Sequence, residues 1–251
     1  NIILNIAGSM GDYLQTQSNT IGGSTLQTHA NNTNSSELIM EGNWDYVVLQ
    51  EQSQYPSFPL WQVEQDVFPY ASQLNQLILN YNECGRTVFF MTWGRENGDL
   101  GNCPNWPPVC TYEGMDDLLR ERYIMMADQN TALLSPVGAV WRYIRDSEYD
   151  IDLYSSDGSH PSVIGSYIAG VCFYTTLFRK DPTEIPWNGN EEWNISESEA
   201  TLIKQVVKLV VYDDFEYWNI ISNDIDNDDI CNYLDNCISE YNPNQEDFDN
   251  D

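Results

Sequence analysis

Short segments that are apolar throughout alternate with longer segments of helical periodicity over the first 211 residues. The apolar segments are "WDYVVLQ" (44–50), "RTVFFMTW" (86–93) and "TALLSPVG" (131–138), and each is expected to form a strand. Strands without polar alternation belong to a sheet that is covered on both faces. The pattern therefore predicts an α/β fold, namely a three-layer α/β/α sandwich around a parallel, flavodoxin-like sheet.

The segments between these strands carry apolar residues at helical spacing. Helices are expected over residues 1–10, 59–82, 115–128, 139–146, 161–179 and 196–211. A further strand is expected near residues 13–17, before a turn at Gly22 and Gly23. The 251 residues are enough for one core of about 200 residues and a short appendage.

The balance of charge excludes one large class of partner. The chain contains 39 Asp and Glu against 10 Lys and Arg, which gives a formal net charge of −29. A surface of this charge repels the phosphate backbone, so we exclude nucleic acid as a partner. No run of about 18 apolar residues occurs, so the sequence predicts no membrane span. The acidic surface favours an extracellular protein and neutralisation by calcium.

Four of the six cysteines form two close pairs, Cys103/Cys110 and Cys231/Cys237. Each pair encloses a short loop, and this spacing predicts two local disulfides in an oxidising compartment. Zinc is the less favoured alternative because no histidine lies near either pair. Cys84 and Cys172 are expected to be buried thiols.

The composition changes near Ile221, since no Lys or Arg occurs beyond Lys208. We therefore predict two domains, residues 1–221 and residues 222–251. In the acidic part, oxygen-bearing residues occupy positions 1, 3, 5, 7, 9 and 12 of a twelve-residue loop that has calcium-ligand spacing. The expected ligands are the side chains of Asp224, Asp226, Asp228, Asn232 and Asp235 and the carbonyl of Ile230. The alternative is a disordered acidic tail.

The acidic segment "DNDDICNYLDNCISEYNPNQEDFDND" closely resembles the thrombospondin type 3 repeat. The resemblance implies structural calcium sites and adds three expected ligands, Asp247, Asp249 and Asp251. These three look like the opening of a further repeat that this chain does not complete. Asp229 and Asn232 depart from the family pattern, which has Gly and Asp at those positions.

A candidate catalytic pair stands before the helix expected at 161–179. In Asp157-Gly158-Ser159-His160-Pro161, a carboxylate and an imidazole lie one tight turn apart. The carboxylate can hold one ring nitrogen while the other nitrogen accepts a proton, as a hydrolase base requires. The alternative is a capping loop in which Asp157 or Ser159 satisfies helix amides.

Five segments resemble a bacterial, carbohydrate-esterase-like branch of the SGNH (GDSL-like) hydrolase superfamily over residues 1–185. They are "NTIGGSTLQTH", "WDYVVLQEQS", "VFFMTWGRENGD", "CPNWPPVCTYEGM" and "DGSHPSVIGSYIAG". The resemblance implies a serine esterase that needs no cofactor for catalysis, with His160 as base and Asp157 orienting it. It also implies an oxyanion hole formed by Gly23 and Gln52, although Gln52 stands where the superfamily carries Asn.

Trp93 and Arg95 follow the C-terminal end of a strand, where open α/β sheets bind ligands, and are expected to contact substrate. A surface ion pair is the equal alternative for Arg95.

The sequence offers one candidate for the nucleophile, Ser9. In "IILNIAGSM" Ser9 would end a strand, but the helical alternative, with Ile2 and Ile6 on one face, is favoured. The nucleophilic serine is then expected upstream of Asn1, on a segment that completes the sheet.

Together these features predict a secreted or cell-surface SGNH-type esterase that deacetylates carbohydrate and carries a calcium-stabilised spacer. Its expected partners are an ester-bearing small molecule or polysaccharide and calcium ions. The alternative is a catalytically inactive hydrolase-like scaffold in a calcium-dependent extracellular structural or adhesive protein.

Overall fold

A three-stranded parallel sheet forms the centre of the protein. The computed structural model describes residues 2–189, 193–226, 228, 230–232 and 234–246. Strands β1 (Tyr46–Leu49), β2 (Arg86–Phe90) and β3 (Leu133–Ser135) lie in the order β1-β2-β3. In this register Val88 lies between Val48 and Leu133. The three apolar segments are therefore strands, as predicted, and each strand is shorter than its segment.

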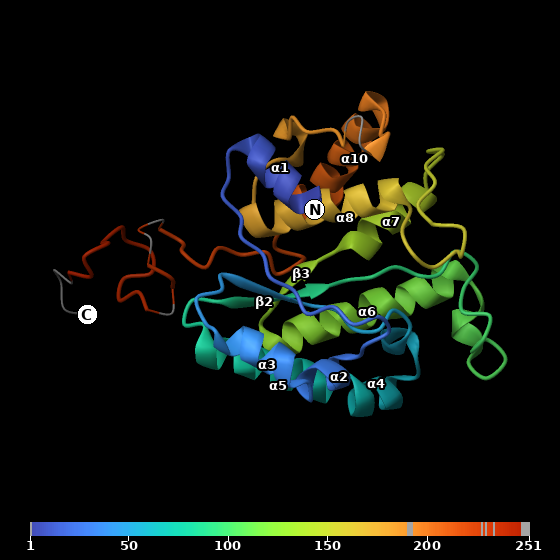
Figure 1. Cartoon of the computed structure of the whole chain (residues 1–251), viewed down its shortest axis with the longest axis horizontal. Helices are drawn as coiled ribbons and strands as arrows, with labels where there is room; N and C mark the ends of the chain where they lie inside the picture. Colours follow the sequence, from blue (N-terminus) through green and yellow to red (C-terminus); the bar gives the residue numbers. More distant parts are fainter. Residues whose placement is uncertain (1, 190–192, 227, 229, 233, 247–251) are drawn as a thin grey trace.

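Helices cover the sheet from two sides, and together with it they form an α/β/α sandwich (Figure 1). One layer contains α1 (Ile2–Met10), α7 (Val137–Arg145), α8 (Val163–Phe178) and α10 (Glu197–Val210). The other contains α2 (Leu26–Ala30), α3 (Thr33–Met40), α4 (Leu60–Asp66), α5 (Phe68–Tyr81) and α6 (Tyr112–Asn130). The predicted fold class is confirmed. Among the described residues, no helix has the combination of length and apolar character that a bilayer crossing requires.

Two predicted elements differ in the structure, and the helices α2 and α3 lie where the sequence predicted no element. The single helix predicted over 59–82 is divided into α4 and α5 at Val67, because Pro69 in the first turn of α5 has no amide hydrogen to continue a helix. The strand expected at 13–17 is not formed, and the segment is irregular there. It has no partner strand, since β1 is hydrogen-bonded to β2 alone within the described sheet.

The edge of the sheet at β1 is less covered than the predicted sandwich requires. Val48 is 43% exposed, whereas its partner Val88 on the central strand is fully buried. A strand edge with unpaired backbone groups is a ready template for a further strand. The described residues therefore leave room for pairing beside β1.

One of the two disulfides ties the acidic segment to the rest of the chain. Cys103–Cys110 is formed as predicted, and Cys172 is a buried thiol. The predicted Cys231–Cys237 disulfide is wrong, and so is the prediction of a thiol at Cys84, because Cys231 is bonded to Cys84 across 147 residues. Spacing favours the near neighbour, but the tail folds back to the loop before β2.

Two hydrogen bonds reinforce this attachment. Arg86 Nη1 donates to the Ile221 carbonyl at 2.8 Å, and Asn223 Nδ2 donates to the Cys84 carbonyl at 2.8 Å. The acidic segment consequently lies at the end of the sheet where β2 begins (Figure 1).

Candidate active site

A tight turn just before α8, closed by a β-bridge between Tyr154 and Pro161, holds the Asp157–His160 pair. Asp157 Oδ1 accepts the backbone amides of Ser159 and His160, each at 2.9 Å, and Oδ2 lies 2.5 Å from His160 Nδ1. The first turn of α8 is capped by a different residue, Ser162, which accepts the Gly165 amide. The carboxylate therefore holds its own turn and the imidazole.

The electrostatics of this pair suit a proton acceptor. The hydrogen bond from the His160 ring, followed by the two backbone amides, holds the pKa of Asp157 well below its ordinary value. An ionised carboxylate at Nδ1 favours the tautomer with the proton on that nitrogen, which leaves Nε2 as the basic atom. The His160 side chain is 79% exposed, so a reactant can reach it.

Residues that follow β2 form hydrogen bonds with the backbone of the His160 turn. Trp93 Nε1 donates to the Ser159 carbonyl at 3.1 Å, and its indole stacks on Trp141 with ring centroids 3.8 Å apart. The Glu96 amide donates to the Gly158 carbonyl at 2.8 Å. These contacts place the His160 turn at the C-terminal end of β2, the edge where open α/β sheets bind ligands. The structure assigns Trp93 a supporting contact, and its contact with substrate stays a prediction.

Arg95 is held by two neighbouring loops. Its Nη1 lies 3.1 Å from Oδ1 of the buried Asp99, and its Nη2 donates to Gln54 Oε1. Arg95 thus forms an ion pair, but with a buried acid and not the surface pair considered as the alternative. A substrate contact for the same guanidinium remains a prediction.

Glu51, which the sequence analysis did not select, links the loop of Gln52 to the segment that follows Gly23. Glu51 directly follows β1 and is only 1% exposed. Its Oε1 accepts the Gln52 amide at 2.6 Å, and its Oε2 accepts the Leu26 amide at 3.1 Å. Leu26 begins α2 just after the turn at Gly23, where φ is +72°. An acid directly after an apolar parallel strand is the signal that could have identified Glu51.

Burial of Glu51 has an electrostatic consequence. It raises the pKa of this carboxyl to about 7, although the Gln52 and Leu26 amides favour the ionised form. The titratable group that faces Glu51 is the buried Tyr123 hydroxyl of α6. Since the pKa is higher in the folded state than in the unfolded chain, protonation stabilises the fold, and this contribution is lost as the pH rises from about 4.5 to about 7.

We therefore expect Glu51→Gln to remove part of the pH dependence of stability. Between pH 4.5 and pH 7.5, the wild type should lose about 3 kcal/mol more unfolding free energy than the variant, since one pKa unit corresponds to about 1.4 kcal/mol. Urea unfolding at a series of pH values measures this difference. The matched control is Asp150→Asn at an exposed acid, which should leave the pH dependence of the wild type unchanged. Parallel curves for wild type and Glu51→Gln would contradict the expectation.

Ser9 is not at the end of a strand. It lies in α1, where its hydroxyl donates to the Ile6 carbonyl at 2.7 Å. The helical prediction for this segment is confirmed, with Ile6 on the buried face.

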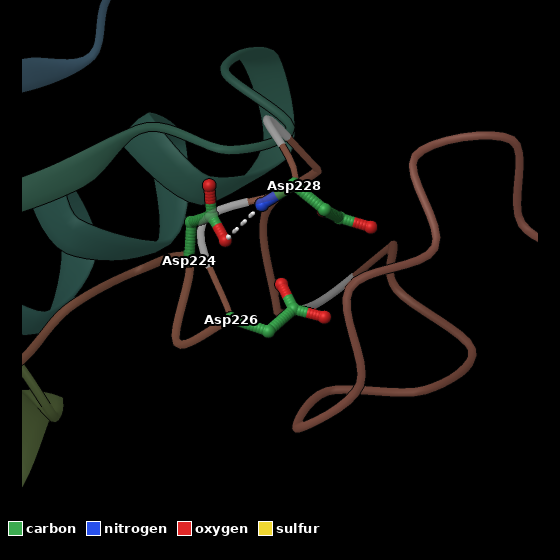
Figure 2. A group of neighbouring side chains, drawn as sticks. All are labelled: Asp224, Asp226 and Asp228. Carbon is green, nitrogen blue, oxygen red and sulfur yellow. Dashed lines mark hydrogen bonds between the residues drawn. The ribbon is translucent and has the colours of Figure 1, made fainter.

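The acidic segment contains a second candidate site. Asp224, Asp226 and Asp228 place carboxylate oxygens within 4.8 Å of one another (Figure 2). Both carboxylate oxygens of Asp226 and Oδ2 of Asp235 are buried without a hydrogen-bond donor among the described residues. Burial, then the charges of Asp228 and Asp235, raises the pKa of Asp226. Crowded, buried oxygens without donors fit a hard cation such as calcium.

Some of the remaining predicted calcium ligands form hydrogen bonds within the acidic segment, and others lie outside the described residues. The Asn232 side-chain oxygen accepts the Ile225 amide at 3.0 Å, and Asp228 Oδ1 accepts the Ile230 amide at 2.8 Å. Three predicted ligands lie outside the described residues: Asp247, Asp249 and Asp251.

Two solved protein structures are similar to this chain in fold. No family model matches the chain, and no curated protein matches it. Among solved structures, a DUF4886 family protein from Bacteroides uniformis ATCC 8492 has a TM-score of 0.71 and 16% identity, over 88% of this chain and 90% of that one. A protein from Slackia heliotrinireducens described as a candidate SGNH hydrolase has a TM-score of 0.55 and 22% identity, over 70% of this chain and 90% of that one. The chain therefore has an α/β fold of the SGNH-hydrolase type.

Proposed function

We propose that this protein is a secreted serine esterase of the SGNH type, in which His160 is the general base and Asp157 orients it. The observation that carries the proposal is the 2.5 Å contact between an exposed imidazole and an ionised carboxylate at the C-terminal end of β2. The fold shared with a candidate SGNH hydrolase supports it. Two disulfides support an oxidising, extracellular location.

The geometry of the pair is suited to acyl transfer in two steps. A serine hydroxyl attacks the ester carbonyl while His160 Nε2 takes its proton, and Asp157 stabilises the imidazolium. The oxyanion of the tetrahedral intermediate accepts hydrogen bonds from the Gly23 amide and the Gln52 side chain. The imidazolium then protonates the leaving alkoxide. Water attacks the acyl-enzyme in the same way and releases the acid.

We place the nucleophilic serine on a strand upstream of Asn1 that pairs with β1. The open edge of β1 and the exposure of Val48 support this position. Acetylated carbohydrate is the substrate class that we propose, on the family resemblance stated above.

The test uses the full-length protein. Release of acetate from an activated acetyl ester and from acetylated xylan measures the activity, and a fluorophosphonate labels an activated serine. Peptide mapping of the label should identify a serine outside residues 1–251. A protein that neither hydrolyses the ester nor takes the label would be the inactive scaffold instead.

We also propose that the acidic segment holds calcium as a structural ion. The ligands would be the side chains and carbonyl predicted from the loop spacing, and the buried, donor-free oxygens of Asp226 and Asp235 support this assignment. Bound calcium would neutralise carboxylates that otherwise repel one another, and so stiffen the segment as a spacer.

Replacing Asp226 with Asn is expected to weaken calcium binding about tenfold or more, because one of its two buried oxygens becomes a neutral donor group. Titration calorimetry with calcium alone measures the affinity. Asp150→Asn, at an exposed acid outside the segment, is the matched control and should leave the affinity unchanged. Absence of calcium binding by the wild type would overturn the assignment.

A further inference from the structure

We propose that Glu51 is a positioning residue that sets the two oxyanion donors, the Gly23 turn and Gln52, in one fixed arrangement. This inference rests on the esterase function proposed above and names a residue that acts on its site without touching the reacting atoms. Glu51 connects two loops that are separated by 25 residues in the sequence.

The two carboxylate oxygens of Glu51 bind different loops. Oε2 accepts the amide of Leu26, the first residue of α2, and Oε1 accepts the amide of Gln52. Above its pKa of about 7 the group is a carboxylate, which is an acceptor at both oxygens and can satisfy two amides at once. An amide side chain of the same size has only one acceptor and would direct an N–H group at one of these donors.

Local hydrogen bonds hold the short chain segment between Gly23 and Leu26. Thr25 caps α2 by accepting the Thr28 amide, and the Ser24 amide donates to the Ile21 carbonyl at 3.1 Å. The turn between these bonds, with Gly23 at φ +72°, is thus continuous with the helix start that Glu51 holds. Fixing the Leu26 amide therefore limits the movement of the Gly23 amide.

Burial of the Glu51 carboxyl group is unfavourable for the free energy of folding. Glu51 is almost completely buried, and burial dominates its electrostatics. Burying an ionisable group is unfavourable, so an apolar residue at this position would give a more stable protein if packing were its only role. A buried, perturbed acid at the ligand edge of a parallel sheet is typical of a functional site.

The experiment compares Glu51→Gln and Glu51→Ala with Asn82→Ala in the full-length protein. Asn82 is also buried and accepts a backbone amide, that of Trp44, at 2.9 Å, but it does so at the opposite end of β1. The kcat and KM for an activated acetyl ester are measured at a temperature where circular dichroism shows every variant folded. We expect both Glu51 variants to lose about 10²-fold in kcat with KM changed less than about threefold, because donor alignment acts on the transition state.

The outcomes separate positioning from packing. Glu51→Gln preserves volume, so wild-type kcat in this variant would overturn the inference. An equal loss in Asn82→Ala would also overturn it, by showing that any buried tie on β1 has the same effect. If Glu51→Ala does not fold, Glu51→Asp, which keeps the charge and shortens the reach, replaces it and should show an intermediate kcat. If the wild type and Glu51→Gln are both fully active, only the positioning role of Glu51 is contradicted. If the wild type is inactive, the proposed esterase function and the positioning role are both contradicted.

Discussion

Replacing His160 with Ala should lower kcat for an activated acetyl ester about 10⁴-fold or more and leave the fold intact. His160 is the only imidazole that pairs with a carboxylate in the described part of the chain, so the serine would lose its proton acceptor. The side chain is 79% exposed and contributes little packing, so its removal creates no cavity in the core. Ester hydrolysis and thermal unfolding are measured on the same preparation.

The second histidine of the chain provides the control. His29 Nδ1 lies 2.9 Å from Ser35 Oγ, which gives it a hydrogen-bonding role away from any carboxylate. His29→Ala should keep kcat within about threefold of the wild type. Retained hydrolysis in His160→Ala would reject the assigned base, and loss of structure in that variant would contradict the exposed position of the ring.

Removing the disulfide between Cys84 and Cys231 should destabilise the fold by about 5 kcal/mol. The two cysteines are 147 residues apart, and closing so long a loop removes much of the entropy of the unfolded chain. The loop contains β2, β3 and every element from α6 to α10, so its closure acts on the domain and not only on the acidic segment. For a chain of this length the expected decrease in melting temperature is roughly 10–20 °C.

The matched control is the local disulfide between Cys103 and Cys110, which are 7 residues apart. Its removal should cost about 2.5 kcal/mol in the same entropy model. Urea unfolding of the two double Ser variants measures the difference. Peptide mapping without reductant should recover a peptide containing Cys84 linked to one containing Cys231. Equal stability of the Cys84/Cys231 variant and the wild type would contradict the predicted role of the long loop.

The local features of this fold could be predicted from the sequence because the interactions that specify them act between near neighbours. Apolar runs fix the three strands, and periodicity fixes most helices, including α1 with Ser9. The Asp157–His160 contact also spans only three residues, so a tight turn suffices to form it. The Cys103–Cys110 disulfide has the same local origin.

Features that depend on distant segments required the tertiary structure. The segment at 13–17 has strand-like residues, yet no neighbouring strand offers it hydrogen bonds. Cys231 bonds to Cys84 and not to Cys237 because the tail returns to the start of β2. The position of Glu51 after a strand is visible in the sequence, but its link to the Leu26 amide on another loop is not.

The sequence by itself determined the layer architecture, the His160 turn and the spacing of the acidic loop, all of which arise from short-range periodicity and turn chemistry. Only the tertiary structure decided which cysteines join, which strand edge stays open and which buried acid links the two segments that we propose for the oxyanion hole. Those outcomes depend on contacts between residues far apart in the chain, and such contacts form only when the whole core packs.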